Sequence, residues 1–68
     1  MKIFIEKENK IVNKTINSKE ILTVKDLLIE LNINQETVII TKNNTLVLVD
    51  EKLDNKDEVK ILSVISGG

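Results

Sequence analysis

The chain has 68 residues, of which 41% are hydrophobic, a size and composition typical of one small globular domain. It contains neither cysteine nor histidine, which excludes disulfides, the usual zinc and copper ligand sets, and Ser-His or Cys-His catalytic pairs. Ten basic residues against eleven acidic ones leave a net charge of −1, and Phe4 is the only aromatic residue, so a basic surface and a base-stacking platform for nucleic acid are both missing.

The apolar runs are too short to span a membrane, and the N-terminus has the pattern of a strand instead of a signal peptide. We therefore expect a soluble cytoplasmic protein that contacts neither membrane nor nucleic acid. We also expect it to bind no metal or cofactor and to be a monomer when free.

The first sixteen residues have the pattern of a β-hairpin. Residues 1–6 alternate, which places Met1, Ile3 and Ile5 on one face and leaves Phe4 on the other. A polar stretch with a turn-forming asparagine follows, and residues 11–16 form a second, weaker strand. A lysine on its apolar face predicts that this strand lies at an edge of the sheet.

A helix follows, and it is the clearest element in the sequence. Thr23 is a good N-cap, and Asp26 three residues later completes an Asp variant of the capping box. The apolar residues then recur at positions i, i+3, i+4 and i+7, namely Val24, Leu27, Leu28 and Leu31. Ile29 lies off this stripe, and Asn32 and Asn34 are expected to end the helix.

Two further apolar stretches, residues 37–41 and 45–49, form a second hairpin. Asn43 and Asn44 between them suit a primed turn, because asparagine tolerates positive φ. A polar loop follows, in which we expect Leu53 to anchor the loop to the core.

The last strand spans about residues 58–65 and is densely apolar, which predicts a central place in the sheet. The order strand, strand, helix, strand, strand, strand indicates an α+β fold in which one helix packs across a mixed sheet of four to five strands. A central last strand would aim the final residues outward from a firm scaffold.

Gly67 and Gly68 are the only two glycines, and they end the chain. Glycine normally supplies positive φ in turns and helix caps, and no turn requires it at this position. A terminal carboxylate on a stem without side chains suits passage through a narrow channel into another protein's active site. The alternative is a frayed end without a role.

Three stretches resemble the β-grasp sulfur-carrier family, which is close to ubiquitin in fold: residues 1–5 (MKIFI), 23–31 (TVKDLLIEL) and 57–68 (DEVKILSVISGG). The resemblance is closest to the thiamine-biosynthesis sulfur carrier, the small subunit of molybdopterin synthase and the small archaeal modifier proteins. The short length favours the thiamine type. The resemblance implies a β-grasp domain over residues 1–65 and a flexible Gly-Gly tail over residues 66–68.

The resemblance also implies a mechanism in which the chain is a carrier and not an enzyme. An activating enzyme would use ATP to adenylate Gly68, and sulfur from a persulfide protein would convert the terminus into a thiocarboxylate. Ser66 and Gly67 would thread the enzyme's channel. An acceptor synthase would then take the sulfur for thiamine (thiazole) or related cofactor synthesis.

Two other functions use the same fold. A ubiquitin-like modifier would join Gly68 to a lysine of a target protein, and a stand-alone interaction module would leave the two glycines without a role. Intact mass spectrometry distinguishes the three.

A docking surface for the partner enzyme is predicted beside the tail. Phe4, Leu62 and Val64 are its candidate residues, since an apolar group becomes informative when it is contiguous with others. The alternative places Leu62 and Val64 in the core and leaves Phe4 as a single exposed aromatic residue.

A cluster of acidic residues between positions 50 and 58 lacks the ligand spacing of an EF-hand, so we expect a solvated loop there and no metal.

Overall fold

The structure is a computed structural model that describes residues 1–17 and 19–64. Its helices and strands follow one another in this order: β1 (Lys2–Ile5), the 3-10 turn η1 (Glu6–Glu8), β2 (Lys10–Asn13), β3 (Leu22–Thr23), α1 (Val24–Glu30), the 3-10 turn η2 (Gln35–Thr37), β4 (Val38–Lys42), β5 (Thr45–Val47), β6 (Lys52–Leu53) and β7 (Glu58–Ser63).

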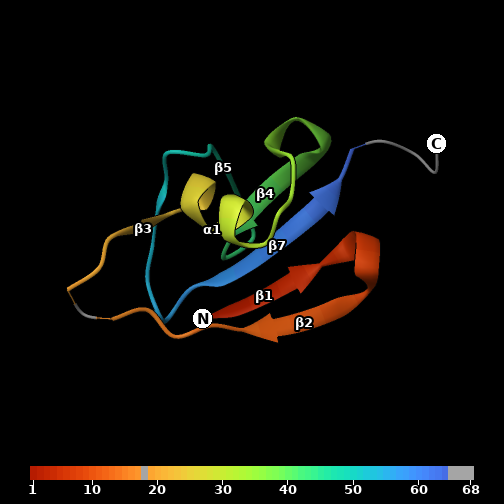
Figure 1. The fold of residues 1–68 in the computed structure, drawn as a ribbon. Helices are drawn as coiled ribbons and strands as arrows, with labels where there is room; N and C mark the ends of the chain where they lie inside the picture. The colour runs from red at the N-terminus through yellow and green to blue at the C-terminus, as the bar shows by residue number, and fades with distance from the viewer. Residues whose placement is uncertain (18, 65–68) are drawn as a thin grey trace.

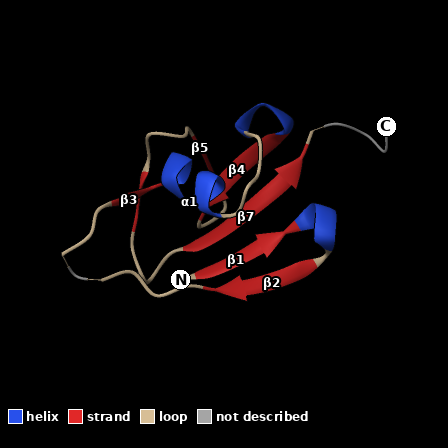
Figure 2. Ribbon diagram, in the orientation of Figure 1, coloured by secondary structure: helices blue, strands red, loops and turns tan. Residues whose placement is uncertain are grey.

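Five of the strands form one mixed sheet with the order β2-β1-β7-β4-β5 (Figure 1). β1 and β7 run parallel, and the other neighbouring strands run antiparallel. β7 therefore lies in the centre, and β2 lies at an edge, as the sequence predicts. The helix α1 lies across one face of this sheet (Figure 2), which confirms the α+β fold class.

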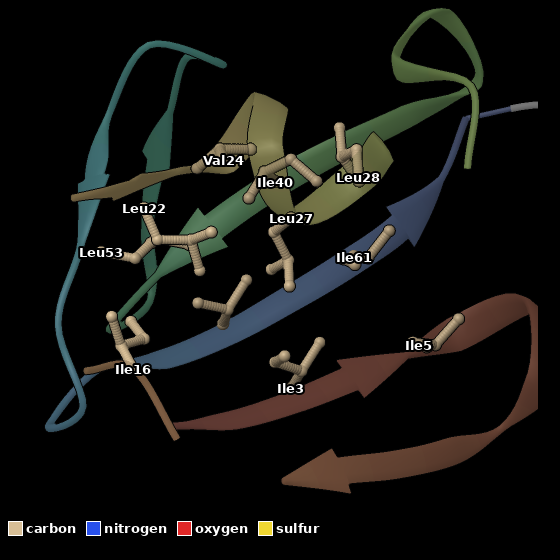
Figure 3. Close-up of a cluster of buried hydrophobic side chains, with 11 residues drawn as sticks. Ile3, Ile5, Ile16, Leu22, Val24, Leu27, Leu28, Ile40, Leu53 and Ile61 are labelled. Carbon is tan, nitrogen blue, oxygen red and sulfur yellow. The ribbon is translucent and has the colours of Figure 1, made fainter. Parts of the chain in front are cut away.

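The core lies between α1 and the sheet face that it covers, here called the inner face (Figure 3). Eleven hydrophobic residues are buried there: Ile3, Ile5, Ile16, Leu22, Val24, Leu27, Leu28, Ile40, Leu53, Val59 and Ile61. The strand residues among them alternate along β1 and β7, as a sheet with one covered face requires. The opposite side of the sheet is here called the outer face.

The predicted capping box of α1 is present. The Thr23 hydroxyl accepts a hydrogen bond from the backbone N–H of Asp26 at 3.2 Å, and the Asp26 carboxylate accepts one from the backbone N–H of Thr23 at 3.1 Å. After the helix, Asn32 takes the left-handed conformation with φ 58°. Asn34 does not end the helix as expected, because its side chain caps η2 by accepting from the N–H of Glu36.

Asparagine takes the place of glycine in the turns. Among the described residues, the non-glycine positions with positive φ are all asparagines: Asn9, Asn32, Asn43 and Asn44. Asn43 and Asn44 have φ 52° and 68°, which fits the primed turn predicted between β4 and β5. The folded domain therefore makes these turns without glycine, which leaves its two glycines to the C-terminus.

The second strand is shorter than expected, because β2 ends at Asn13 and not at Ile16. Beyond it, the Asn55 side chain accepts a hydrogen bond from the N–H of Ile16 at 2.7 Å and donates one to its carbonyl at 2.8 Å. Lys14 still exchanges hydrogen bonds with Met1, at 2.9 and 2.8 Å, and beyond that pair the two Asn55 bonds hold Ile16, which is buried in the core.

The polar loop also contains a strand that the sequence pattern does not reveal. Leu53 is buried, as predicted for an anchor, but it belongs to β6, which pairs with β3 in a second, two-stranded sheet. Leu22 lies opposite Leu53 in this pairing.

The strand expected over residues 45–49 ends at Val47, because the carbonyl of Val49 accepts a hydrogen bond from the N–H of Lys25 in α1.

Candidate functional site

The residues predicted to react or to thread a partner's channel, Ser66, Gly67 and Gly68, lie outside the described residues. The last strand is expected over residues 58–65. In the structure β7 ends at Ser63, Val64 follows it, and residue 65 lies outside the described residues. We call Ser63 and Val64 the tail root, since the chain passes from the sheet to its C-terminus through them. The site is therefore built from the tail root and its surroundings.

Hydrogen bonds hold the tail root from two sides. The N–H of Ser63 donates to the Glu6 carboxylate at 3.0 Å, and the N–H of Val64 donates to the carbonyl of Thr37 at 3.1 Å. Glu6 belongs to η1 and Thr37 to η2, and Figure 1 shows these two turns on either side of the end of β7. The central strand of the sheet is thus held at its end, and four residues follow the tail root to the C-terminus.

Phe4 and Leu62, two of the predicted docking residues, lie on the outer face of the sheet. Leu62 alternates with Ile61, which is buried on the inner face, and pairs with Ile39 of β4. Phe4 alternates with the buried residues Ile3 and Ile5. The alternative that places Leu62 under the helix is therefore wrong.

The third predicted docking residue, Val64, is 47% exposed in the tail root. It follows β7 directly, so it stands beside the end of the outer face that carries Leu62. The structure places all three predicted residues outside the core, and their role in docking remains a prediction.

The outer face carries three further apolar residues that the sequence analysis did not select. Ile11 of β2 pairs with Phe4 and is 54% exposed. Ile39 and Leu46 are also exposed, and Leu46 pairs with Thr41 on the same face. We call the resulting group the outer apolar patch: Phe4, Ile11, Ile39, Leu46 and Leu62. The alternation around buried Ile40 and Val59 was the signal available in the sequence, but it requires knowing which face the helix covers.

Polar groups lie at the centre of the outer apolar patch. Lys60 pairs with both Phe4 and Thr41, and its ammonium donates to the side-chain oxygen of Asn44 at 3.1 Å. The Thr41 hydroxyl oxygen is buried and has no hydrogen-bond partner among the described residues. Charged and polar groups within an apolar surface can fix the register of a bound protein.

The acidic loop uses its carboxylates for local contacts. Lys42 donates to the Glu51 carboxylate, and this bond raises the pKa of Lys42 above 10.5. The Asp57 carboxylate accepts from the side chain of Asn43 at 2.9 Å and from the N–H of Asp54 at 2.7 Å. Within residues 1–17 and 19–64, no group of three or more acidic residues is arranged to hold a metal ion.

None of the helices in the described part of the chain is long and apolar enough to cross a membrane.

Comparison with known proteins identifies the family. The sequence profile of the ThiS family matches residues 2–68. The crystal structure of the thiamine biosynthesis protein ThiS from Geobacter metallireducens is similar over the whole length of both chains, with 26% sequence identity and a TM-score of 0.64. These matches confirm the resemblance drawn from the opening strand, the capped helix and the last strand with its Gly-Gly end. The chain belongs to the ThiS family of β-grasp sulfur carriers, which are small carrier proteins and not enzymes.

Proposed function

We propose that this carrier holds sulfur as a thiocarboxylate on Gly68 and delivers it for the synthesis of thiazole in thiamine or of a related cofactor. The observation that carries the proposal is the position of β7. This strand lies in the centre of the sheet, and only three residues separate its last residue, Ser63, from the terminal Gly67-Gly68. The similarity to a thiamine biosynthesis protein supports the pathway.

The chemistry starts from a carboxylate, which is a poor electrophile. In the activating enzyme, a carboxylate oxygen of Gly68 attacks the α-phosphorus of ATP, and pyrophosphate leaves. The sulfur of a protein persulfide then attacks the carbonyl carbon, and AMP leaves with the electron pair of the broken C–O bond. A thiol reductant cleaves the resulting acyl disulfide and leaves the thiocarboxylate. The carrier contributes the carboxylate, and the partner supplies ATP and the in-line geometry.

The partners are therefore an adenylating enzyme, a persulfide protein and an acceptor synthase. The adenylating enzyme binds the outer apolar patch, because this surface and Val64 lie next to the tail root. Contact with the patch brings the body of the carrier to the enzyme, and Ser66 and Gly67 then lead Gly68 into the closed site.

Intact mass spectrometry of the protein isolated from its host tests the proposal. We expect a species in which one terminal oxygen is replaced by sulfur, and fragmentation should locate the change at Gly68. A ladder of heavier conjugates would instead indicate a protein modifier. An unmodified terminus together with no adenylation by any activating enzyme of the host would leave only an interaction module and would refute the proposal.

Gly68→Ala tests whether the tail must pass through a narrow channel. The added Cβ obstructs the approach to the α-phosphate, so we expect adenylation to fall by about a hundredfold or more, because small displacements of reacting groups are costly. ATP–pyrophosphate exchange measures the rate, and urea unfolding should show unchanged stability. Turnover equal to that of the unsubstituted protein would contradict the channel.

A further inference from the structure

The hydrogen bond from Ser63 to Glu6 replaces a missing rung of the parallel ladder. The ladder between β1 and β7 begins where the N–H of Lys2 donates to the carbonyl of Asp57 at 3.3 Å. Lys2 lies opposite Glu58 and Ile5 opposite Ile61, and the hydrogen bonds of this ladder recur every two residues. The N–H of Ser63 would therefore meet the backbone carbonyl of Glu6 if β1 continued.

That carbonyl is directed elsewhere, because the chain turns into η1 at Glu6. The carbonyl of Glu6 accepts from the N–H of Asn9 at 3.0 Å, and Asn9 closes the turn with φ 48°. The side chain of Glu6 supplies the acceptor that its own backbone has withdrawn. Figure 1 shows η1 beside the end of β7, where the Glu6 side chain replaces the Glu6 carbonyl as acceptor.

The two sides of the tail root are held differently. On the η2 side, the acceptor for Val64 is the backbone carbonyl of Thr37, a residue that is itself fixed by two hydrogen bonds to the carbonyl of Asn34. On the η1 side, the acceptor is a side chain. Substitution can therefore remove the Glu6 bond and leave the rest of the sheet in place.

We propose that Glu6 is a positioning residue for the reaction at Gly68, which acts by holding the backbone of Ser63 and so fixing where the tail begins. This inference rests on the proposed function. It assigns Glu6 no contact with ATP, with sulfur or with the carboxylate of Gly68.

A fixed root matters because the tail is short. The four residues after Val64 can span at most about 14 Å, so the position of the root limits where the carboxylate can arrive. If the root frays, additional backbone must be ordered in the activated complex. Each fully ordered residue then lowers the population of that complex by a factor of about five to thirty. Loss of one exposed hydrogen bond to a carboxylate frays the root only in part, so we expect about a three- to tenfold effect.

Three variants of the full chain separate the hydrogen bond from the charge. Glu6→Ala removes both, whereas Glu6→Gln removes the charge and keeps an oxygen acceptor in the same place. Glu8→Ala is the matched control, because Glu8 is an exposed carboxylate in the same turn and forms an ion pair with Lys10 of β2 at 3.7 Å.

Amide exchange in the free protein tests the hold itself. We expect the Ser63 amide of Glu6→Ala to exchange about three- to tenfold faster than in the unsubstituted protein, with Glu6→Gln and Glu8→Ala close to normal. Equal Ser63 exchange in all four proteins would overturn the inference, whether or not the protein is adenylated.

Adenylation by the host's activating enzyme tests the consequence. We expect Glu6→Ala to lower kcat by about three- to tenfold while KM stays unchanged, because the outer apolar patch is intact and only the delivery of the tail suffers. Glu6→Gln should restore kcat. A Glu6→Gln variant as slow as Glu6→Ala would show that the charge matters and not the bond, and would overturn the inference. Absence of adenylation in the unsubstituted protein would instead refute the proposed function, and the exchange experiment would still decide whether Glu6 holds the root.

Discussion

The inner and outer faces of the same sheet have almost equally apolar residues but different surroundings. On the inner face, Ile61 and Ile40 are 2% and 3% exposed beneath α1. On the outer face, the sequence neighbour Leu62 is half-buried, and the sequence neighbour Ile39 is 42% exposed. Burial under the helix explains the first pair. The second pair gains less from folding, and contact with a partner is the role that we propose for the outer apolar patch.

Ile61 and Leu62 give the sharpest test of this difference, because they are adjacent in one strand. Ile61→Ala leaves a cavity in the core, and we expect it to lower the free energy of unfolding by about 3 kcal/mol. Leu62→Ala removes a partly buried side chain from the outer face, and we expect a smaller loss of about 1.5 kcal/mol. Urea unfolding of both variants measures the contrast. Equal losses would mean that the outer face is as much a part of the core as the inner face.

Phe4 tests what the outer face is for. Phe4→Glu places a charge in the middle of the outer apolar patch, and we expect KM for the carrier in the adenylation reaction to rise about tenfold or more. Ile29→Glu is the matched control, because Ile29 is a 66% exposed apolar residue on α1, across the molecule from the outer face. A similar rise in KM for both variants would indicate a nonspecific charge effect and would remove the outer apolar patch as the docking surface.

Thr23 tests the element that makes the two faces different, because its hydroxyl caps the helix that covers the inner face. Thr23→Ala removes the cap, and we expect a loss of about 1 kcal/mol in the free energy of unfolding with KM unchanged. Thr23→Ser keeps the hydroxyl and should lose less. A change in KM in the alanine variant would show that the helix face also contributes to docking.

The elements that the sequence predicted well are those set by local chemistry. The cap at Thr23 and the primed turn at Asn43-Asn44 each depend on residues within a few positions of one another. The family resemblance likewise rests on contiguous stretches, and the profile match over residues 2–68 confirms it.

The features that the sequence did not predict depend on long-range contacts. β3 and β6 pair through residues 31 positions apart, Leu22 and Leu53, and each strand is too short to show a period. The hydrogen bonds that hold Ile16 beyond β2 come from the side chain of Asn55, far along the chain. β4 reads Val-Ile-Ile-Thr-Lys, apolar on both faces at its start, so its pattern does not assign Ile39 to the outer face. The sequence did not indicate a role for Glu6, because its hydrogen-bond partner is the backbone N–H of Ser63, which every residue except proline would supply.

Lys42 gives the smallest predicted effect and extends the comparison to charge. It lies two residues after buried Ile40 and so on the same, inner face, at the end of β4. Its ammonium donates to the Glu51 carboxylate and to the carbonyl of Lys52. The hydrogen bond to Glu51 raises the pKa of Lys42 above 10.5; partial removal from water opposes this rise, and the charges of Glu51, Asp57 and Asp54 add to it.

Because the pKa is raised in the folded state, the charged lysine stabilises the fold, and this contribution is complete at pH values below 10.5, the pKa of the lysine in the unfolded chain. It is lost as the pH rises through the folded-state pKa, so the free energy of unfolding should decline over that range. The decline should be small, since the Lys42 side chain remains 23% exposed and water screens the pair.

Lys42→Gln should remove this part of the decline. Lys60→Gln on the outer face should retain it, because the Lys60 ammonium donates to the neutral amide oxygen of Asn44. Urea unfolding below pH 10.5 and at the highest pH of reversible unfolding measures both variants, and an identical pH dependence in Lys42→Gln and the unsubstituted protein would show that the pair adds nothing to the edge of the inner face.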